Sequence, residues 1–182
     1  MTSQRIGKYA CLEVERRYLL KRMPEDVPAV TGGWLITDRY LPNTRLRLRK
    51  MESITGIDVV YKLTQKYRSE TQNAYETTIT NLYLTEAEYN FFQPLEANVL
   101  RKRRYPYSGQ DHDFSIDVFE GRHQGLILAE MEVEKTTELD NPVLPLFAFK
   151  DVTGDPFFSG GNLAVVKDEE FRHGLAQRIH NY

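Results

Sequence analysis

The stretch Glu13-Val14-Glu15-Arg16-Arg17-Tyr18-Leu19-Leu20 decides how the whole chain is interpreted. Read as a β-strand, it alternates between two faces, and Glu13, Glu15 and Arg17 share one of them. The other face carries Leu12, Val14, Tyr18 and Leu20, with Arg16 as its single charge. A half-buried strand ordinarily turns its charged face to water, so solvent exposure is the first interpretation of this strand.

Several later segments repeat the alternation, and their charges are complementary. Extended structure is expected over residues 34–36, 39–41, 44–50, 58–67, 74–80, 99–107, 114–119 and 126–134. Cations gather on some of these segments: Arg45, Arg47, Arg49, Lys62, Lys66, Lys102 and Arg104. Carboxylates gather on others: Glu76, Asp117, Glu130, Glu132 and Glu134.

Short, mostly consecutive strands with turns between them favour an antiparallel sheet that curls or closes. If the apolar faces pack outward against helices, the charged faces line the inside of a barrel. If the charged faces point outward instead, the result is an ordinary sheet with a solvated face. Periodicity alone favours the solvated arrangement.

Three helices are expected. Thr85-Glu86-Ala87-Glu88 matches a capping box and predicts a helix from about Glu86 to Ala97, with Phe91, Phe92 and Leu95 at helical spacing. The Pro-containing segment from Asn141 to Phe149 is expected to hold a short helix. Residues from Lys167 onward predict a third, with Phe171, Leu175 and Ile179 spaced by four.

Length and composition limit the class of protein. The 182 residues fit one domain over residues 1–182, and a net charge of -2 argues against a nucleic-acid partner. Cys11 is the single cysteine, which predicts a cytoplasmic protein with a small buried thiol at this position. No apolar run is long enough to predict a membrane span. The four histidines lack paired metal-binding spacing and are expected to be lone surface residues: His112, His123, His173 and His180.

The two sets of charges suit one kind of ligand if they face inward. Oligophosphates require several Arg and Lys donors, because guanidinium forks match phosphate oxygens and Lys supplies a point charge. They also require Mg²⁺ or Mn²⁺, which are hard ions that prefer oxygen ligands. No Gly-rich phosphate loop of the G-x-x-x-x-G-K-[ST] kind is present, so a cationic clamp would have to replace it.

A series of short motifs, in order along nearly the whole chain, resembles the CYTH superfamily, also called triphosphate tunnel metalloenzymes. The motifs are Glu13-x-Glu15-x-Arg17, the Arg-x-Arg pairs of residues 45–49, Leu63-Thr64-Gln65-Lys66, Lys102-Arg103-Arg104-Tyr105, Asp117-Val118-Phe119, Gly125-Leu126 with Ala129-Glu130-Met131-Glu132, and Val152-Thr153-Gly154-Asp155-Pro156 followed by Asn162-Leu163-Ala164. The resemblance implies a mainly β, α+β fold: a closed eight-stranded antiparallel β-barrel tunnel with flanking helices.

The resemblance also implies roles for the site residues. Catalysis is assigned to Glu13, Glu15, Arg17 and Glu132. Phosphate binding is assigned to Arg17, Arg45, Arg47, Arg49, Lys62, Lys66, Lys102 and Arg104. Metal ligation is assigned to Glu13, Glu15, Asp117, Glu130 and Glu132, with Glu76 as a supporting residue that orients cations. Two positions depart from the family pattern: Arg17 stands where Lys is usual, and Phe157 stands where many members carry Arg.

The expected activity is hydrolysis of triphosphates with Mg²⁺ or Mn²⁺, inorganic triphosphate first and nucleoside triphosphates second. The alternatives within the family are a CYTH-type adenylate cyclase and a thiamine triphosphatase. A non-catalytic module that binds polyphosphate or nucleotide is the alternative from another class, and the absence of Arg at Phe157 gives it weight. The expected partner is a small-molecule triphosphate, not nucleic acid or membrane, and a homodimer is left open.

Overall fold

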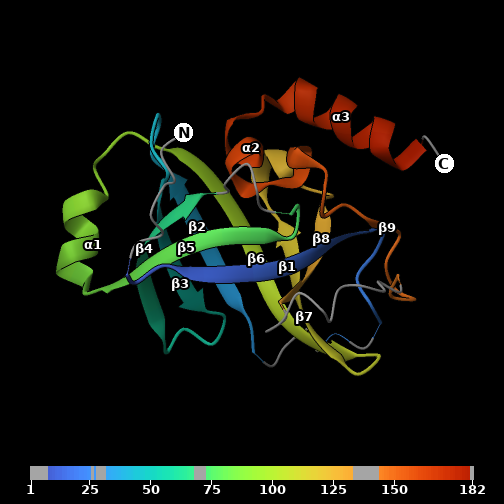
Figure 1. Ribbon diagram of the computed structural model, residues 1–182, viewed down its shortest axis with the longest axis horizontal. Coiled ribbons are helices and arrows are strands. Elements are labelled where there is room, and N and C mark those ends of the chain that lie inside the picture. Colours follow the sequence, from blue (N-terminus) through green and yellow to red (C-terminus); the bar gives the residue numbers. More distant parts are fainter. Residues whose placement is uncertain (1–7, 26, 28–31, 68–72, 133–143, 181–182) are drawn as a thin grey trace.

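Eight antiparallel strands close into a barrel in this computed structural model, which describes residues 8–25, 27, 32–67, 73–132 and 144–180. The strands are β1 (Cys11–Leu20), β2 (Trp34–Tyr40), β3 (Leu46–Ser53), β4 (Val59–Tyr67), β5 (Glu76–Leu84), β6 (Asn98–Gly109), β7 (His112–Phe119) and β8 (Ile127–Glu132). Their order around the barrel is β5-β4-β3-β2-β6-β7-β8-β1, and pairing of β1 with β5 closes it. The expected eight-stranded antiparallel barrel is confirmed (Figure 1).

The two extended pieces expected at residues 34–36 and 39–41 form one strand, β2, which pairs with β3 and β6 along its whole length. A ninth short strand, β9 (Lys150–Asp151), adds to the outside of the barrel by pairing with β1. The strand expected over 126–134 is described as far as Glu132, and Glu134 lies outside the described residues.

The apolar face of β1 points out of the barrel, and the charged face points in. Val14, Tyr18 and Leu20 are buried in a cluster with residues of the neighbouring strands, namely Phe114, Ile116, Ala129 and Met131. Partly buried side chains such as Phe147 cover this cluster from outside. Most of the packing that stabilises β1 therefore lies on its outer side, which leaves the interior beside Glu13, Glu15 and Arg17 to polar groups and contradicts the solvated arrangement that periodicity favoured.

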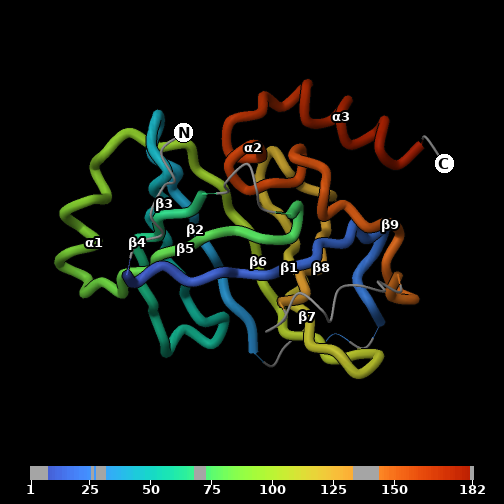
Figure 2. The backbone as a smooth tube through the Cα atoms, viewed as in Figure 1, coloured from blue at the N-terminus to red at the C-terminus, as the bar shows by residue number. Residues whose placement is uncertain are grey.

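The segment with α2 (Gly160–Val165) and α3 (Asp168–His180) lies over one end of the barrel (Figure 2), where a second apolar cluster closes it. Phe158 and Leu163 pack there against inward-pointing residues of three strands, namely Leu100, Phe119 and Leu128. They come from η3 (Pro156–Phe158) and α2 (Gly160–Val165), and α3 (Asp168–His180) adds Phe171. The predicted C-terminal helix is therefore confirmed, and its function in the fold is to hold this closure in place.

The capping box at Thr85 is confirmed, but the helix that follows is shorter than expected. α1 runs over Glu86–Phe92, with the Glu88 backbone N–H donating to the Thr85 hydroxyl at 3.3 Å. Pro94 explains the early end, because proline has no backbone N–H and cannot continue the helical hydrogen bonds beyond Gln93. Tyr89, rather than Phe91, faces the barrel and packs on Tyr61 at 4.7 Å between ring centroids.

Three further expectations were wrong within the described residues. Residues 144–149 form no helix, so the described part of the expected 141–149 helix is a loop. Cys11 is exposed rather than buried, because β1 pairs with β5 only from Cys11 onward and leaves its first residue at the rim. His123 is fully buried rather than a surface residue. Among the described helices, none has the length and apolar character needed to cross a membrane.

His123 predicts an acid-sensitive fold. Its Nε2 donates to the carbonyl oxygen of Leu163 at 2.7 Å, and burial lowers its pKa. The unfolded chain takes up this proton near pH 6.5, whereas the folded protein resists it until lower pH. This contribution to stability is therefore present above pH 6.5 and is lost as the pH falls below it, by up to about 1.4 kcal/mol per pH unit.

The measurement is the free energy of unfolding in urea between pH 5 and pH 8 for the wild type and His123→Gln. Gln retains an N–H donor for the Leu163 carbonyl but does not titrate, so the variant should have a shallower slope below pH 6.5. Equal slopes in the two proteins would contradict the assignment.

Candidate functional site

A cavity of about 890 Å³ lies inside the barrel and brings the two sets of predicted charges together. Its carboxylate wall, from β1 and β8, consists of Glu13, Glu15, Glu130 and Glu132. Its cation wall, from β3, β4, β6 and the turn after β2, consists of Arg45, Arg47, Arg49, Lys66, Lys102 and Arg104. Arg17 belongs to the carboxylate side of the barrel because β1 carries it beside Glu15.

Two buried aspartates hold the deeper part of the cation wall. Arg49 donates to both oxygens of Asp38, at 2.6 and 2.7 Å. Arg104 donates to both oxygens of Asp117 at 2.7 Å, and Lys102 also donates to Asp117. Burial lowers the pKa of Lys102, and the adjacent Arg104 charge lowers it further. These ion pairs fix the cations in place and leave few of their donors free.

Arg47 is held less completely than its neighbours. Its Nε lies 3.6 Å from the nearer Asp38 oxygen and has no hydrogen-bond partner among the described residues. Burial alone would lower the pKa of Arg47, but the Asp38 charge and the Tyr40 oxygen raise it, so the guanidinium stays charged. Arg47 therefore lines the cavity with a guanidinium that is committed to a carboxylate less completely than that of Arg49.

Arg17 links the carboxylate wall to the closed end of the barrel. It donates to Glu15 at 2.6 Å, to Glu130 at 3.3 Å and to the backbone carbonyl of Phe158 at 3.2 Å. Arg104 also donates to Glu130. Burial alone would raise the pKa of Glu130, but the charges of Lys102, Arg104 and Arg17 hold it well below its usual range.

The outer part of the carboxylate wall carries uncompensated negative charge. Lys66 donates to Glu13 and lies 3.9 Å from Glu15. Glu132 has no ion pair among the described residues, and burial together with the charges of Glu13 and Glu15 raises its pKa. Three carboxylates that repel one another at the cavity surface are suited to a hard cation.

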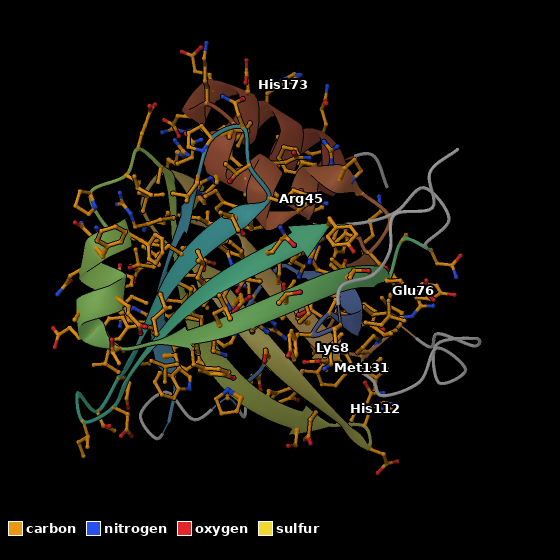
Figure 3. All side chains as sticks on the ribbon, turned by 60° about the vertical axis from the view of Figure 1, so that its left-hand side comes forward. Lys8, Arg45, Glu76, His112, Met131 and His173 are labelled. Atoms are coloured by element: carbon orange, nitrogen blue, oxygen red, sulfur yellow. The ribbon has the colours of Figure 1, made fainter. Side chains whose placement is uncertain are left out.

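Three of the expected site residues lie elsewhere. Asp117, expected as a metal ligand, is fully buried behind the wall, because its register opposite Arg104 commits both oxygens to Arg104 and Lys102. Lys62 does not line the cavity, and its ammonium lies 4.8 Å from the centroid of the Tyr83 ring. Glu76 pairs with Val14, on the outward side of β1, and points away from the barrel in Figure 3.

Arg45 lies at the rim of the cavity, in the turn between β2 and β3 (Figure 3). Its guanidinium is stacked over the ring of Tyr67 at 4.7 Å, which holds an exposed side chain near the opening. The predicted phosphate-binding residues therefore divide into deep, paired cations and a less constrained pair, Arg45 and Arg47.

Phe157, which departs from the family pattern, faces away from the cavity. Its ring stacks on Phe171 at 6.0 Å, and the Arg178 guanidinium lies 4.1 Å from its centroid. Arg178 also donates to Asp155 at 2.5 and 3.1 Å. Phe157 thus docks α3 onto the barrel, and the arginine that α3 supplies binds Asp155 rather than the cavity.

Sequence reasoning missed Asp38 and Tyr40, which both line the cavity. Asp38 is buried beneath Arg49, and Tyr40 lies beside Arg47 in the adjacent strand. The alternation of side chains could have identified both, because residues 38 and 40 share one face of β2 once residues 34–40 are read as one strand. Dividing the stretch into two short pieces concealed this alternation.

The donor set fits Mg²⁺ or Mn²⁺ in its chemistry, since Glu13, Glu15 and Glu132 offer oxygen ligands with excess negative charge. Within the described part of the chain, however, no three acidic, His or Cys side chains converge closely enough to form a metal site as they stand. Glu13 is occupied by Lys66, and Glu15 by Arg17. Metal ligation by these residues therefore requires them to exchange ion-pair partners.

No protein-family model matches the chain. The chain is 28% identical over 106 residues to an inorganic triphosphatase of Acetivibrio thermocellus, and the match covers 51% of this chain and 65% of that protein. It therefore spans slightly less than two thirds of that relative.

The fold resembles a crystal structure of the inorganic triphosphatase NE1496, with a TM-score of 0.57 and 21% identity over 85% of this chain and 95% of that one. A crystal structure described as the hypothetical protein NE1496 gives the same TM-score, at 22% identity over 85% and 98% of the two chains. These structural matches concern the fold alone. The name of the relative, an inorganic triphosphatase, agrees with the resemblance drawn from the motifs.

Proposed function

We propose that this chain, which shares the barrel of the triphosphate tunnel metalloenzymes, hydrolyses inorganic triphosphate in the presence of Mg²⁺ or Mn²⁺. The observation that carries the proposal is that a cation wall and a carboxylate wall face one cavity closed at one end by apolar packing. A polyanion together with a divalent cation is the ligand that satisfies both walls. The inorganic triphosphatase of A. thermocellus supports this choice of substrate.

The residues of the cation wall bind and orient the phosphates. Arg47 and Arg45 have guanidinium donors that are not committed to carboxylates, and the deeper Lys102 and Arg104 supply positive charge from fixed positions. Charge-assisted bonds from a rigid set of donors hold the phosphate chain in one register, which is the main requirement of phosphoryl transfer.

The carboxylate wall would hold the cation through Glu13, Glu15 and Glu132. When bound, a divalent cation neutralises charge that develops on the phosphate oxygens and aligns water for in-line attack. Lys66 is placed to exchange Glu13 for a phosphate, because it lines the cavity and its ammonium contacts the outer carboxylates Glu13 and Glu15. Arg17 keeps Glu15 and Glu130 in position from behind.

The test is an incubation with tripolyphosphate, ATP and thiamine triphosphate, each with Mg²⁺ or Mn²⁺, in which phosphate, pyrophosphate and cyclic AMP are measured separately. The expected result is metal-dependent phosphate release, fastest from tripolyphosphate. Pyrophosphate and cyclic AMP from ATP would identify a cyclase instead. Binding of tripolyphosphate without any release would support a binding module.

The other expectations stay predictions. They are a single domain over residues 1–182 and a cytoplasmic location based on the single cysteine. The oligomeric state is left open, with a homodimer as the alternative to a monomer.

A further inference from the structure

Gly160, the first residue of α2, lies against the hydroxyl of Tyr40. A Cβ atom at Gly160 would overlap the Tyr40 oxygen and lie 3.1 Å from Cζ of the same ring. Gly160 is not among the described glycines with positive φ, so any residue could adopt its backbone conformation. The absence of a side chain at Gly160 is therefore explained by space for Tyr40, and not by the conformation of the chain.

Tyr40 in turn faces Arg47 directly across the β2–β3 ladder, where the two are register partners. Burial raises the pKa of Tyr40, and the Asp38 charge adds to this effect, so the hydroxyl keeps its proton at neutral pH. Arg47 lacks the two-pronged carboxylate contact that fixes Arg49, and its Nε has no hydrogen-bond partner among the described residues. Arg47 has a side-chain hydrogen bond with Tyr40, so the Tyr40 oxygen helps to determine where the Arg47 guanidinium points.

We infer that Tyr40 is a positioning residue for phosphate binding, because it holds the Arg47 guanidinium toward the cavity. The Tyr40 hydroxyl in turn packs against Gly160, where there is no side chain. This inference rests on the proposed function, because it assigns Arg47 to the triphosphate. It adds a link from the helix that closes the barrel, α2, to the cation wall. Gly160 is the residue of α2 that makes this link, through its contact with Tyr40.

Two substitutions separate the parts of this link. Tyr40→Phe removes the hydroxyl and keeps the ring, and it should weaken tripolyphosphate binding about two- to tenfold, which is the contribution of one hydrogen bond. The change should appear in KM, with kcat nearly unchanged, because a positioning role in binding is shared by the ground state and the transition state. Gly160→Ala pushes the hydroxyl aside and should weaken binding by about tenfold or more.

Combining the substitutions tests the contact itself. In Gly160→Ala with Tyr40→Phe, the overlapping oxygen is gone and only Cζ must move by a few tenths of an ångström. We therefore expect the double variant to bind tripolyphosphate as Tyr40→Phe alone does. Gly154→Ala is the matched control, since a Cβ there meets only Ala74 at the ordinary distance of 3.8 Å. Its affinity should equal that of the wild type.

Arg47→Ala tests whether Tyr40 acts through Arg47. In that background, Tyr40→Phe should cause no further loss of tripolyphosphate affinity, measured by calorimetry without metal. If Tyr40→Phe binds like the wild type, or weakens binding equally with and without Arg47, this inference is overturned while the proposed function stands. If the wild type itself does not bind tripolyphosphate, the proposed function falls, and this inference falls with it.

Discussion

Glu132→Gln is expected to remove metal-dependent phosphate release while leaving the fold intact. Glu132 has no ion pair among the described residues, and the charges of Glu13 and Glu15 contribute to its raised pKa. A neutral amide of the same shape is a poorer ligand for a hard cation. We expect turnover of tripolyphosphate to fall by about 100-fold or more, because loss of a residue that only supports a metal ligand already costs about 10- to 100-fold.

The same substitution should raise the melting temperature of the metal-free protein. A raised carboxyl pKa means that the charged form is disfavoured in the folded state, so Glu132 lowers stability as the pH rises through its raised pKa. A neutral Gln at this position removes the repulsion between Glu132 and the charges of Glu13 and Glu15. Loss of activity combined with a gain in stability separates a metal ligand from a structural residue, which would lose both.

Glu52→Gln is the control for Glu132→Gln. Glu52 lies in β3 in a partly exposed pair with Lys50, which contributes little to stability. Its phosphate release should follow the wild-type curve across a titration of Mg²⁺ and of Mn²⁺. If Glu132→Gln also follows that curve, the carboxylate wall does not hold the cation.

Arg47→Ala is expected to weaken tripolyphosphate binding by one to two powers of ten. A charge-assisted hydrogen bond contributes about 1.5–3 kcal/mol, and every 1.4 kcal/mol is a tenfold change in affinity. Arg47 lines the cavity, and its buried Nε has no hydrogen-bond partner among the described residues. Calorimetry with tripolyphosphate in the absence of metal isolates this effect from the carboxylate wall.

Arg103→Ala provides the matched control for Arg47→Ala. Arg103 neighbours Lys102 and Arg104 in β6 but does not line the cavity, and it donates to Glu120 at 2.7 Å on the exposed side. Its loss should leave tripolyphosphate affinity unchanged. An equal loss in both variants would mean that the ligand is attracted by overall positive charge and not held inside the barrel.

The faces of the strands could be predicted from the sequence, because strict alternation assigned Glu13, Glu15, Glu130 and Glu132 to one side each time. Which side is the interior could not be predicted from periodicity. The outer cluster around Tyr18 and Met131 and a solvated sheet produce the same alternation. The motifs that resemble the triphosphate tunnel family resolved this choice, and the structure confirmed it.

Which charged side chains pair with one another, and which are left for a ligand, depends on strand register, and the sequence does not show register. Asp117 and Glu132 both lie on the inward faces of their strands. Asp117 lies opposite Arg104 and accepts hydrogen bonds from it with both oxygens, whereas Glu132 lies opposite Glu15. Asp38 was missed for a related reason, since an aspartate beside Arg39 in β2 reveals its partner Arg49 only when β2 and β3 are aligned. The early end of α1 could have been predicted from Pro94.

The most direct measurement of the proposed site is a crystal structure with Mn²⁺ and a slowly hydrolysed imido analogue of triphosphate, with the metal located by anomalous scattering. We predict an anomalous peak at the carboxylate wall, within bonding distance of oxygens of Glu13, Glu15 or Glu132. We also predict that phosphate oxygens accept hydrogen bonds from Arg47 and Lys66 inside the barrel. Mn²⁺ bound away from these carboxylates, or the analogue bound outside the cavity, would contradict the proposal.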